Sequence, residues 1–270
     1  MPALNTDEFM EGKTVEYVKL ANGVEIPKIG YGVFQISKDD APRCVREAIE
    51  TGYRHIDTAQ SYFNEAEVGQ GIKDSGIDRK DLFLTTKIWI SNYGYENTLR
   101  SVDVSLKKLG TDYLDLVLLH QPFSDTYGAW RALEKLYKDG VIRAIGVSNF
   151  YPDRLADMVA FNEIAPMVDQ VETNPLNQQI EARKNMVKRG VAQEAWAPFG
   201  EGHAEHVLQS HPGQDWRGTW QVRRAGDPAL AHSARHRRSA QVHAQGAHGR
   251  KPEHLRFPAL RQRDDNHRGP

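Results

Sequence analysis

Cysteine is nearly absent from this chain, since Cys44 is the single thiol among 270 residues. One thiol cannot close an intramolecular disulfide, so a scaffold held by such bonds is excluded. The sequence also lacks an apolar run near the roughly 18 residues of a transmembrane helix. The polar residues 1–13 lack the apolar segment of a secretory signal, and we expect them to be flexible. We therefore predict a reducing, cytoplasmic location and no membrane role.

An excess of charge of one sign is lacking as well. The formal net charge is -1 and the isoelectric point is about 6.8, whereas attraction to nucleic acid or anionic lipid requires a surplus of Lys and Arg. We therefore expect a monomer whose partner is a small molecule and not a nucleic acid. With 39% hydrophobic residues, the length fits a single α/β barrel domain.

Alternating segments indicate how this domain is organised. Val15–Leu20 and Val24–Ile29 flank an Asn-Gly turn, which is typical of a β-hairpin. Short β-prone runs follow, their starts about 25 to 30 residues apart: 31–35, 55–59, 82–88, 113–120, 141–148, 167–171 and 191–197. Amphipathic helical patterns lie between several of them: 43–50, 97–108, 128–138 and 154–161. Strands alternating with helices predict a parallel sheet with right-handed crossovers.

Seven such units in series favour a closed (β/α)8 TIM barrel preceded by a hairpin. A doubly wound sheet is the competitor, but its phosphate-binding fingerprint is missing, because Gly69 and Gly71 lie in a helical pattern and Asp74 replaces the third glycine. An eighth strand and helix would have to follow Pro198, where the composition changes abruptly. We therefore predict a barrel over residues 14–202 that is incomplete at its C-terminal end.

Residues 203–270 differ in composition from the rest of the chain. They hold nine of the eleven histidines, with eleven Arg and one Lys against six acids, so this part carries +6 and the body -7. Large apolar residues are few and show no period, so burial cannot offset the entropy of ordering. The histidines lack the spacing of a known metal site, and we expect no metal. We predict a tail that is disordered, or the product of a reading-frame shift.

Four residues in the body have the chemistry and placement for carbonyl reduction. Asp57, Lys87 and His120 end successive predicted strands, and Tyr62 lies in the loop after the first of these. Active sites of such barrels form at the C-terminal ends of the strands. A tyrosine can act as the acid if a neighbouring cation stabilises its phenolate, as Lys87 could, with Asp57 anchoring the lysine. A neutral His120 could orient the carbonyl oxygen.

Five segments carry further motifs: Gly52–Ala59 with Tyr62, Thr86–Lys87, Leu118–His120, Gly146–Phe150 and Asp169–Glu172. In their order and spacing these segments resemble the aldo-keto reductase family. The resemblance covers about residues 14–202 and is nearest to bacterial members that include 2,5-diketogluconate and glyoxal reductases. It implies that Asp57, Tyr62, Lys87 and His120 form the catalytic tetrad. It also implies an oxidoreductase that reduces aldehydes or ketones by hydride transfer from NADPH.

The same resemblance implies roles for further residues. Ser148, Asn149 and Gln170 would bind the nicotinamide carboxamide, and Trp196 would stack on the ring. The substrate pocket would be lined by Phe34 and Trp89, together with His120. Gln121 stands where many relatives carry Trp, which leaves the substrate open.

Alternatives remain for single residues and for the whole chain. Taken alone, Asp57 could cap a helix, Lys87 could be a solvated charge, and Trp89 and Trp196 could be core residues. The family's contacts to the adenosine 2′-phosphate follow the eighth strand, and only Lys251 offers a lysine there, so a preference for NADPH over NADH is weakly predicted. The chain could also be an impaired barrel remnant that lacks this cofactor-clamping segment, or a regulatory nucleotide-binding module.

Overall fold

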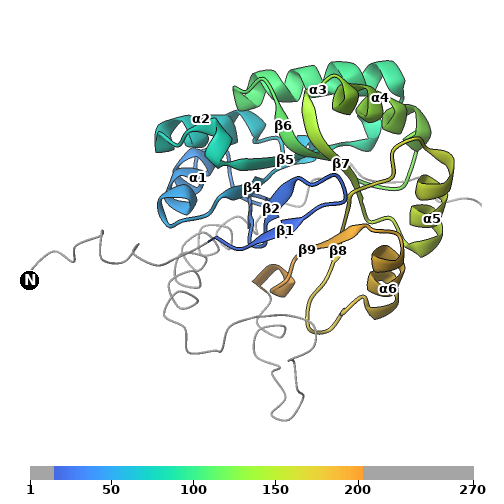
Figure 1. The fold of residues 1–270 in the computed structure, drawn as a ribbon. Coiled ribbons are helices and arrows are strands. Elements are labelled where there is room, and N and C mark those ends of the chain that lie inside the picture. The colour runs from blue at the N-terminus through green and yellow to red at the C-terminus, as the bar shows by residue number, and fades with distance from the viewer. Residues whose placement is uncertain (1–14, 203–270) are drawn as a thin grey trace, which may run out of the picture. The chain divides into compact units, whose positions relative to one another are not determined.

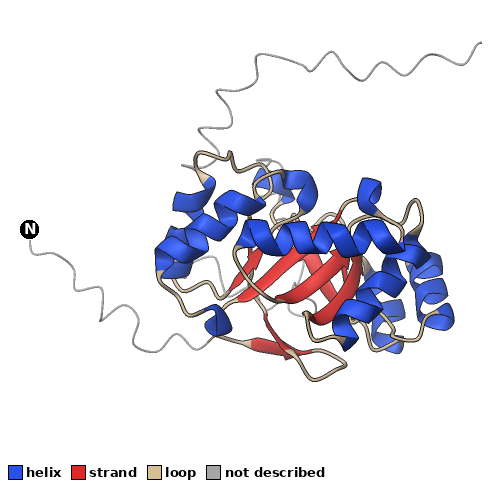
Figure 2. Cartoon of the chain, turned by 90° about the horizontal axis from the view of Figure 1, so that it is seen from above, coloured by secondary structure: helices blue, strands red, loops and turns tan. Residues whose placement is uncertain are grey.

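The computed structural model describes residues 15–202, in which a curled parallel sheet is surrounded by helices (Figure 1, Figure 2). The strands pair in sequence order and form a half-barrel. Its seven strands are β3 (Tyr31–Gly32), β4 (His55–Asp57), β5 (Phe83–Ile88), β6 (Leu114–Leu119), β7 (Ile142–Ser148), β8 (Val168–Glu172) and β9 (Ala192–Trp196). The helices between them are α1 (Ala41–Glu50), α2 (Glu65–Ser75), α3 (Tyr95–Leu109), α4 (Thr126–Lys138), α5 (Pro152–Phe161) and α6 (Ile180–Lys188).

The predicted hairpin is present as β1 (Tyr17–Lys19) and β2 (Glu25–Pro27), which pair antiparallel. Asn22 in its turn donates to the backbone oxygen of Arg143, near the start of β7, at 2.9 Å. Leu20 and Ile26 are buried in the main core. The hairpin therefore packs against the N-terminal ends of the strands, opposite the end at which Asp57 and Lys87 lie.

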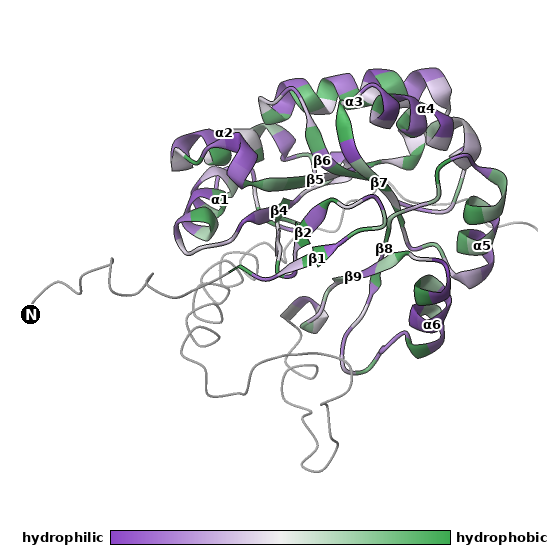
Figure 3. Cartoon of the chain, in the orientation of Figure 1, coloured by the Kyte–Doolittle hydropathy of each residue, from purple (hydrophilic) through white to green (hydrophobic). Residues whose placement is uncertain are grey.

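The central strands are buried on both faces because helices cover one face and side chains fill the other. Every residue of β5 and of β6 is buried. Figure 3 shows the hydrophobic colour concentrated in these strands, whereas the helices alternate between hydrophobic and hydrophilic stretches. Trp130 of α4 is fully buried, and its indole nitrogen donates to the Ile164 oxygen at 2.9 Å. This core fixes the positions of the strand ends that carry the polar residues of the site.

Gly69 and Gly71 lie inside α2, as their helical pattern predicted, and so do not form a dinucleotide-binding loop. A Cβ on Gly69 would meet the backbone oxygens of Lys108 and Leu109 at 2.7 Å. A Cβ on Gly71 would meet the Pro42 oxygen at 2.6 Å and the Val45 Cβ at 2.8 Å. These glycines therefore allow α2 to pack closely against α1 and against the end of α3.

We expect Gly71→Ala to lower the free energy of unfolding by about 1 to 3 kcal/mol, the usual cost of overpacking a closely packed site. The loss occurs even though alanine favours a helix more than glycine does. Chemical denaturation measures it, with Gln70→Ala on the exposed face of α2 as the matched control. An unchanged midpoint for Gly71→Ala would contradict this packing.

The seven predicted parallel strands are confirmed within residues 15–202, with boundaries that shift by a few residues, and six helices connect them. The expected flexible N-terminus and the residues from 203 onward lie outside the described residues, and so does any eighth strand. Within residues 15–202 no helix is long and apolar enough to cross a membrane.

Candidate active site

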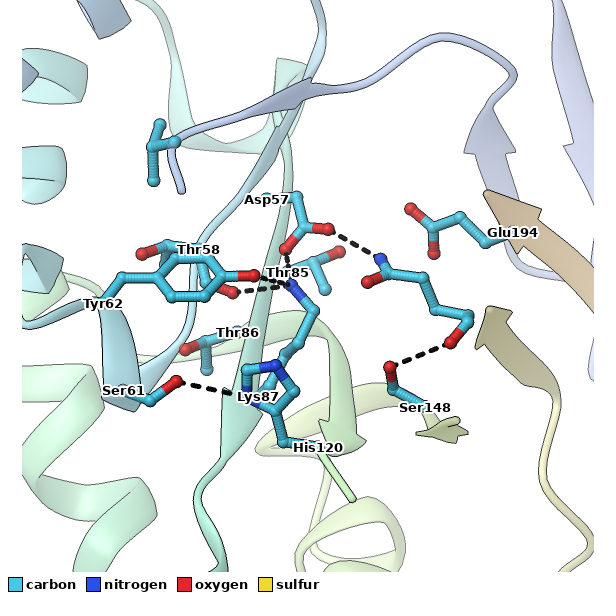
Figure 4. A network of polar contacts seen from close by, with 12 residues as sticks. Asp57, Thr58, Ser61, Tyr62, Thr85, Thr86, Lys87, His120, Ser148 and Glu194 are labelled. Carbon is cyan, nitrogen blue, oxygen red and sulfur yellow. Dashed lines mark hydrogen bonds and ion pairs between the residues drawn. The ribbon is translucent and has the colours of Figure 1, made fainter. Parts of the chain in front are cut away.

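The C-terminal ends of β4, β5 and β6 bring four predicted site residues together (Figure 4). Asp57 is the last residue of β4, Lys87 lies in β5, and His120 directly follows β6. Tyr62 closes a 3-10 turn, Gln60–Tyr62, that follows β4. The register of the parallel strands places these residues side by side, because Asp57 pairs with Thr85 and Lys87 with Leu118.

Lys87 is the centre of this group. Its side chain is 1% exposed, and its ammonium donates to Asp57 Oδ1 and, at 3.0 Å, to the Thr58 backbone oxygen. The Tyr62 hydroxyl lies 3.4 Å from the same nitrogen. A buried ammonium needs such partners, since an unpaired one would lose its proton. The lysine thus links the carboxylate to the phenol.

Burial and charge act in opposite directions on these groups. Burial alone would lower the pKa of Lys87, but the Asp57 carboxylate and the Tyr62 oxygen raise it above its ordinary value. For Tyr62, burial raises the pKa, and the nearby Lys87 offsets only part of this effect. Lys87 thus acts on the phenolate in the direction that the sequence analysis expected, but burial has the larger effect on the pKa of Tyr62. Tyr62 remains a protonated phenol at neutral pH.

His120 faces Tyr62 across the site. Its Nδ1 lies 3.3 Å from the Ser61 hydroxyl, and its ring contacts that of Tyr62 edge to face, with centroids 5.8 Å apart. Burial lowers the pKa of His120 to about 3, and the positive charge of Lys87 acts in the same direction. The imidazole is therefore neutral across the physiological range, as the sequence predicted.

We expect the His120 ring resonances to stay unchanged in an NMR titration from pH 8 to pH 5. Because the folded-state pKa lies below the ordinary value, the unfolded chain takes up a proton as pH falls below about 6.5 and the folded chain does not. The contribution of His120 to the free energy of unfolding is therefore lost progressively as pH falls from about 6.5 towards about 3. A His120 midpoint near pH 6.5 would contradict a buried neutral ring.

Aromatic rings border the tetrad, as predicted for the substrate pocket. The Phe34 ring lies 4.9 Å from that of Tyr62, and the Trp89 ring lies 5.3 Å from that of His120. Phe34 is 52% exposed, so its ring offers apolar surface to solvent beside the Tyr62 phenol. The two rings therefore add aromatic surface on either side of Tyr62 and His120.

Gln60 is a residue that the sequence analysis missed. Its carbonyl oxygen accepts from the Trp89 backbone nitrogen at 3.0 Å and from Asn92 at 2.8 Å. Its amide donates to the Ser101 oxygen and to the Ser105 hydroxyl of α3. Gln60 therefore fixes the start of the loop that carries Trp89. In the sequence, its position two residues before Tyr62 was the one feature that could have identified Gln60 as part of the site.

The four predicted cofactor residues lie in β7, β8 and β9 or directly after β7. Ser148 ends β7 and donates to the Gln170 backbone oxygen at 2.8 Å. Asn149 adopts a left-handed conformation (φ 64°), which Asn tolerates better than most residues. Its amide donates to the His120 backbone oxygen at 3.1 Å and its oxygen accepts from the Trp196 indole at 2.9 Å. Asn149 thus connects the predicted nicotinamide site to the tetrad.

Gln170 connects to the tetrad as well, because its amide donates to Asp57 Oδ2 at 2.6 Å. Behind it lies Glu194 of β9, a second residue that the sequence analysis did not single out. Glu194 Oε2 is buried and has no hydrogen-bond partner among the described residues. Burial, together with the negative charge of Asp57, raises the pKa of Glu194 to about 8. Burial and the neighbouring Asp57 thus favour the protonated form of the Glu194 carboxyl.

Metal ligands do not gather at this site. Among residues 15–202, no three His, Cys, Asp or Glu side chains are arranged to hold a metal ion. His55, the other histidine of this part of the chain, bonds Thr85 at 2.9 Å, and burial lowers its pKa to about 4.

Comparisons with known proteins agree with this geometry. The sequence model of the aldo/keto reductase family matches residues 28–253. A glyoxal reductase of Bacillus subtilis (strain 168) is 51% identical over 187 residues, which are 68% of this chain and 68% of that protein.

Solved structures give the same result. The crystal structure of an aldo/keto reductase from Brucella melitensis is 50% identical, with a TM-score of 0.68 over 69% of this chain and 74% of that one. An aldo-keto reductase of Bombyx mori, crystallised in complex with NADP, is 33% identical, with a TM-score of 0.69 over 84% of this chain and 77% of that one. Since the family match spans most of the sequence, the chain belongs to the aldo/keto reductase family.

Proposed function

We propose that this protein reduces the carbonyl group of small aldehydes or ketones to an alcohol, with NADPH as the hydride donor and Tyr62 as the proton donor. The observation that carries the proposal is the position of the Lys87 ammonium. It bonds Asp57 Oδ1 and lies 3.4 Å from the Tyr62 hydroxyl. Reduction of a carbonyl places negative charge on its oxygen, and this arrangement supplies a proton to that oxygen.

Each member of the tetrad has a distinct part in the proposed reaction. Tyr62 is protonated before the reaction, because burial raises its pKa. As the phenol releases its proton, the adjacent Lys87 stabilises the phenolate, and Asp57 keeps the lysine charged and in place. His120, neutral at all physiological pH values, donates a hydrogen bond that orients the carbonyl oxygen.

The four residues in and after these strands, from β7, β8 and β9, fit a nicotinamide. Ser148, Asn149 and Gln170 present both donors and acceptors, as a carboxamide requires, and Trp196 adds a broad aromatic face. When bound there, the cofactor supplies the hydride. Gln170 donates to Asp57, so a carboxamide at Gln170 would share or replace that bond. The similar Bombyx mori protein binds NADP, which supports this choice of cofactor.

The proposed substrates are small dicarbonyls and related aldehydes. The similarity to a glyoxal reductase supports this class, and the exposed Phe34 ring with Trp89 offers apolar contacts beside the phenol. The backbone at Gln121 is fixed by Tyr93, whose hydroxyl donates to the Gln121 oxygen at 2.8 Å and accepts from its nitrogen at 3.1 Å. The side chain at position 121 can therefore vary without moving His120.

An impaired barrel remnant is the second candidate. The sequence after residue 202 favours it, because Lys251 is the one lysine there that could contact an adenosine 2′-phosphate. Two measurements separate the candidates. Fluorescence titration with NADPH reports binding, and loss of NADPH absorbance on adding glyoxal or methylglyoxal reports turnover. We expect both binding and turnover. Tight binding without oxidation of NADPH by any aldehyde would overturn the proposed activity, and absence of binding would favour the remnant.

A further inference from the structure

The hydroxyl of Ser61 has one polar partner among the described residues, the Nδ1 atom of His120 at 3.3 Å. Ser61 lies in the 3-10 turn directly before Tyr62, so the same turn carries both the proton donor and this contact. In Figure 4 the dashed line joins Ser61 to the ring edge of His120 that points away from Tyr62 and Lys87. The other ring nitrogen, Nε2, therefore remains available to the site.

Two proton arrangements are compatible with this contact. A neutral imidazole carries its proton either on Nδ1 or on Nε2, and the other nitrogen is then an acceptor. If Nδ1 carries the proton, it donates to Ser61 and Nε2 is a bare acceptor. If Nε2 carries the proton, Ser61 donates to Nδ1 and Nε2 becomes a donor.

The chemistry of the site selects between the two arrangements. A developing alkoxide oxygen requires donors, and a bare Nε2 acceptor would repel it. With Nδ1 protonated, moreover, the Ser61 hydroxyl proton would have no acceptor among the described side chains and backbone oxygens. With Nε2 protonated, the Ser61 hydroxyl donates a hydrogen bond to Nδ1, and the Nε2 proton faces the site.

We propose that Ser61 is a positioning residue whose hydroxyl donates a hydrogen bond to His120 Nδ1. This bond holds the neutral imidazole in the tautomer that carries its proton on Nε2, which then donates towards the substrate oxygen. The role of this tautomer in catalysis rests on the proposed function. The tautomer itself can be measured without turnover.

The remaining contacts of His120 fix its backbone but not its proton. Its nitrogen donates to the Ile88 oxygen at 3.1 Å and its oxygen accepts from Asn149 at 3.1 Å. Its ring packs edge to face against Tyr62 and Trp89, which supply no polar atom to Nδ1. Ser61 is thus the side chain that can set the tautomer.

The test compares Ser61→Thr with Ser61→Val, two β-branched side chains of the same shape that differ by the hydroxyl. In the full chain labelled with ¹⁵N-histidine, the His120 signals are identified by their loss in His120→Gln. We expect Nε2 to be protonated and Nδ1 to be an unprotonated, hydrogen-bonded nitrogen in the parent and in Ser61→Thr. In Ser61→Val the Nδ1 resonance should move towards that of a free acceptor, or the ring should populate both tautomers.

A protonated Nδ1 in the parent, or the same Nδ1 resonance in the Thr and Val variants, overturns the proposal. In the accompanying assay, kcat should be about fivefold lower for Ser61→Val than for Ser61→Thr, the factor that corresponds to one ordinary hydrogen bond. KM should change little, because the hydroxyl acts through His120 and not on the substrate. If the parent binds NADPH but reduces no aldehyde, the proposed function fails, while the resonances still decide the role of Ser61.

Discussion

Tyr62→Phe should lower the turnover of carbonyl substrates by about 100-fold or more, the usual cost of removing a general acid. The substitution removes the phenolic proton that lies beside Lys87 and little else, because the ring can keep its contacts with Phe34 and His120. Steady-state oxidation of NADPH with methylglyoxal measures the loss. The thermal midpoint of unfolding should stay close to that of the parent.

The matched control is Tyr137→Phe, which removes a hydroxyl at the hairpin end of the domain, 3.4 Å from Asn22. Its turnover should equal that of the parent. If Tyr62→Phe kept more than a tenth of the parental turnover, Tyr62 would not be the proton donor.

Lys87→Met should lose both turnover and stability. Methionine fills the space of the buried stem, but Asp57 then keeps its charge without its cation, and breaking a buried ion pair in this way costs about 3 to 5 kcal/mol. Turnover should fall by about 100-fold or more, because the phenolate formed at Tyr62 loses its stabilising charge. Urea denaturation and the methylglyoxal assay measure the two losses separately.

Two controls show whether the loss comes from the ion pair. Lys73→Met, on the exposed face of α2, should change the unfolding free energy by less than about 0.5 kcal/mol. The double variant Asp57→Asn with Lys87→Met removes the orphaned charge, so it should regain part of the stability and none of the turnover. Full activity of Lys87→Met would show that the lysine has no part in proton transfer.

The order of the elements was predictable because two periods are visible in the sequence. Runs such as Leu114–Leu119 are nearly continuous in their apolar character, which is expected for a strand covered by helices. In the segments between the runs, apolar residues recur every three or four positions. The hairpin followed from its Asn-Gly turn. The edges of the elements were less predictable. Helix α4 begins at Thr126 and not at Gly128, and it is capped by Asp125, whose carboxylate accepts from the Gly128 nitrogen.

The proximity of Asp57, Lys87 and His120 was predictable because strand ends converge at one edge of a parallel sheet. The contacts that orient them were not, because they depend on side chains far apart in sequence. The bond from Gln170 to Asp57 spans 113 positions, and that from Trp196 to Asn149 spans 47. The net direction of the Tyr62 pKa was also beyond sequence reasoning, since burial depends on packing that no motif reports.

The transfer of deuterium from NADPH tests the central claim most directly. NADPH carrying deuterium at the transferable position of its nicotinamide is mixed with methylglyoxal and the full chain, and the product is analysed by mass spectrometry. The proposed reaction predicts an alcohol with one deuterium on the former carbonyl carbon, and loss of this product in Tyr62→Phe. Unlabelled substrate recovered intact, from a chain that binds NADPH, would contradict carbonyl reduction at this site.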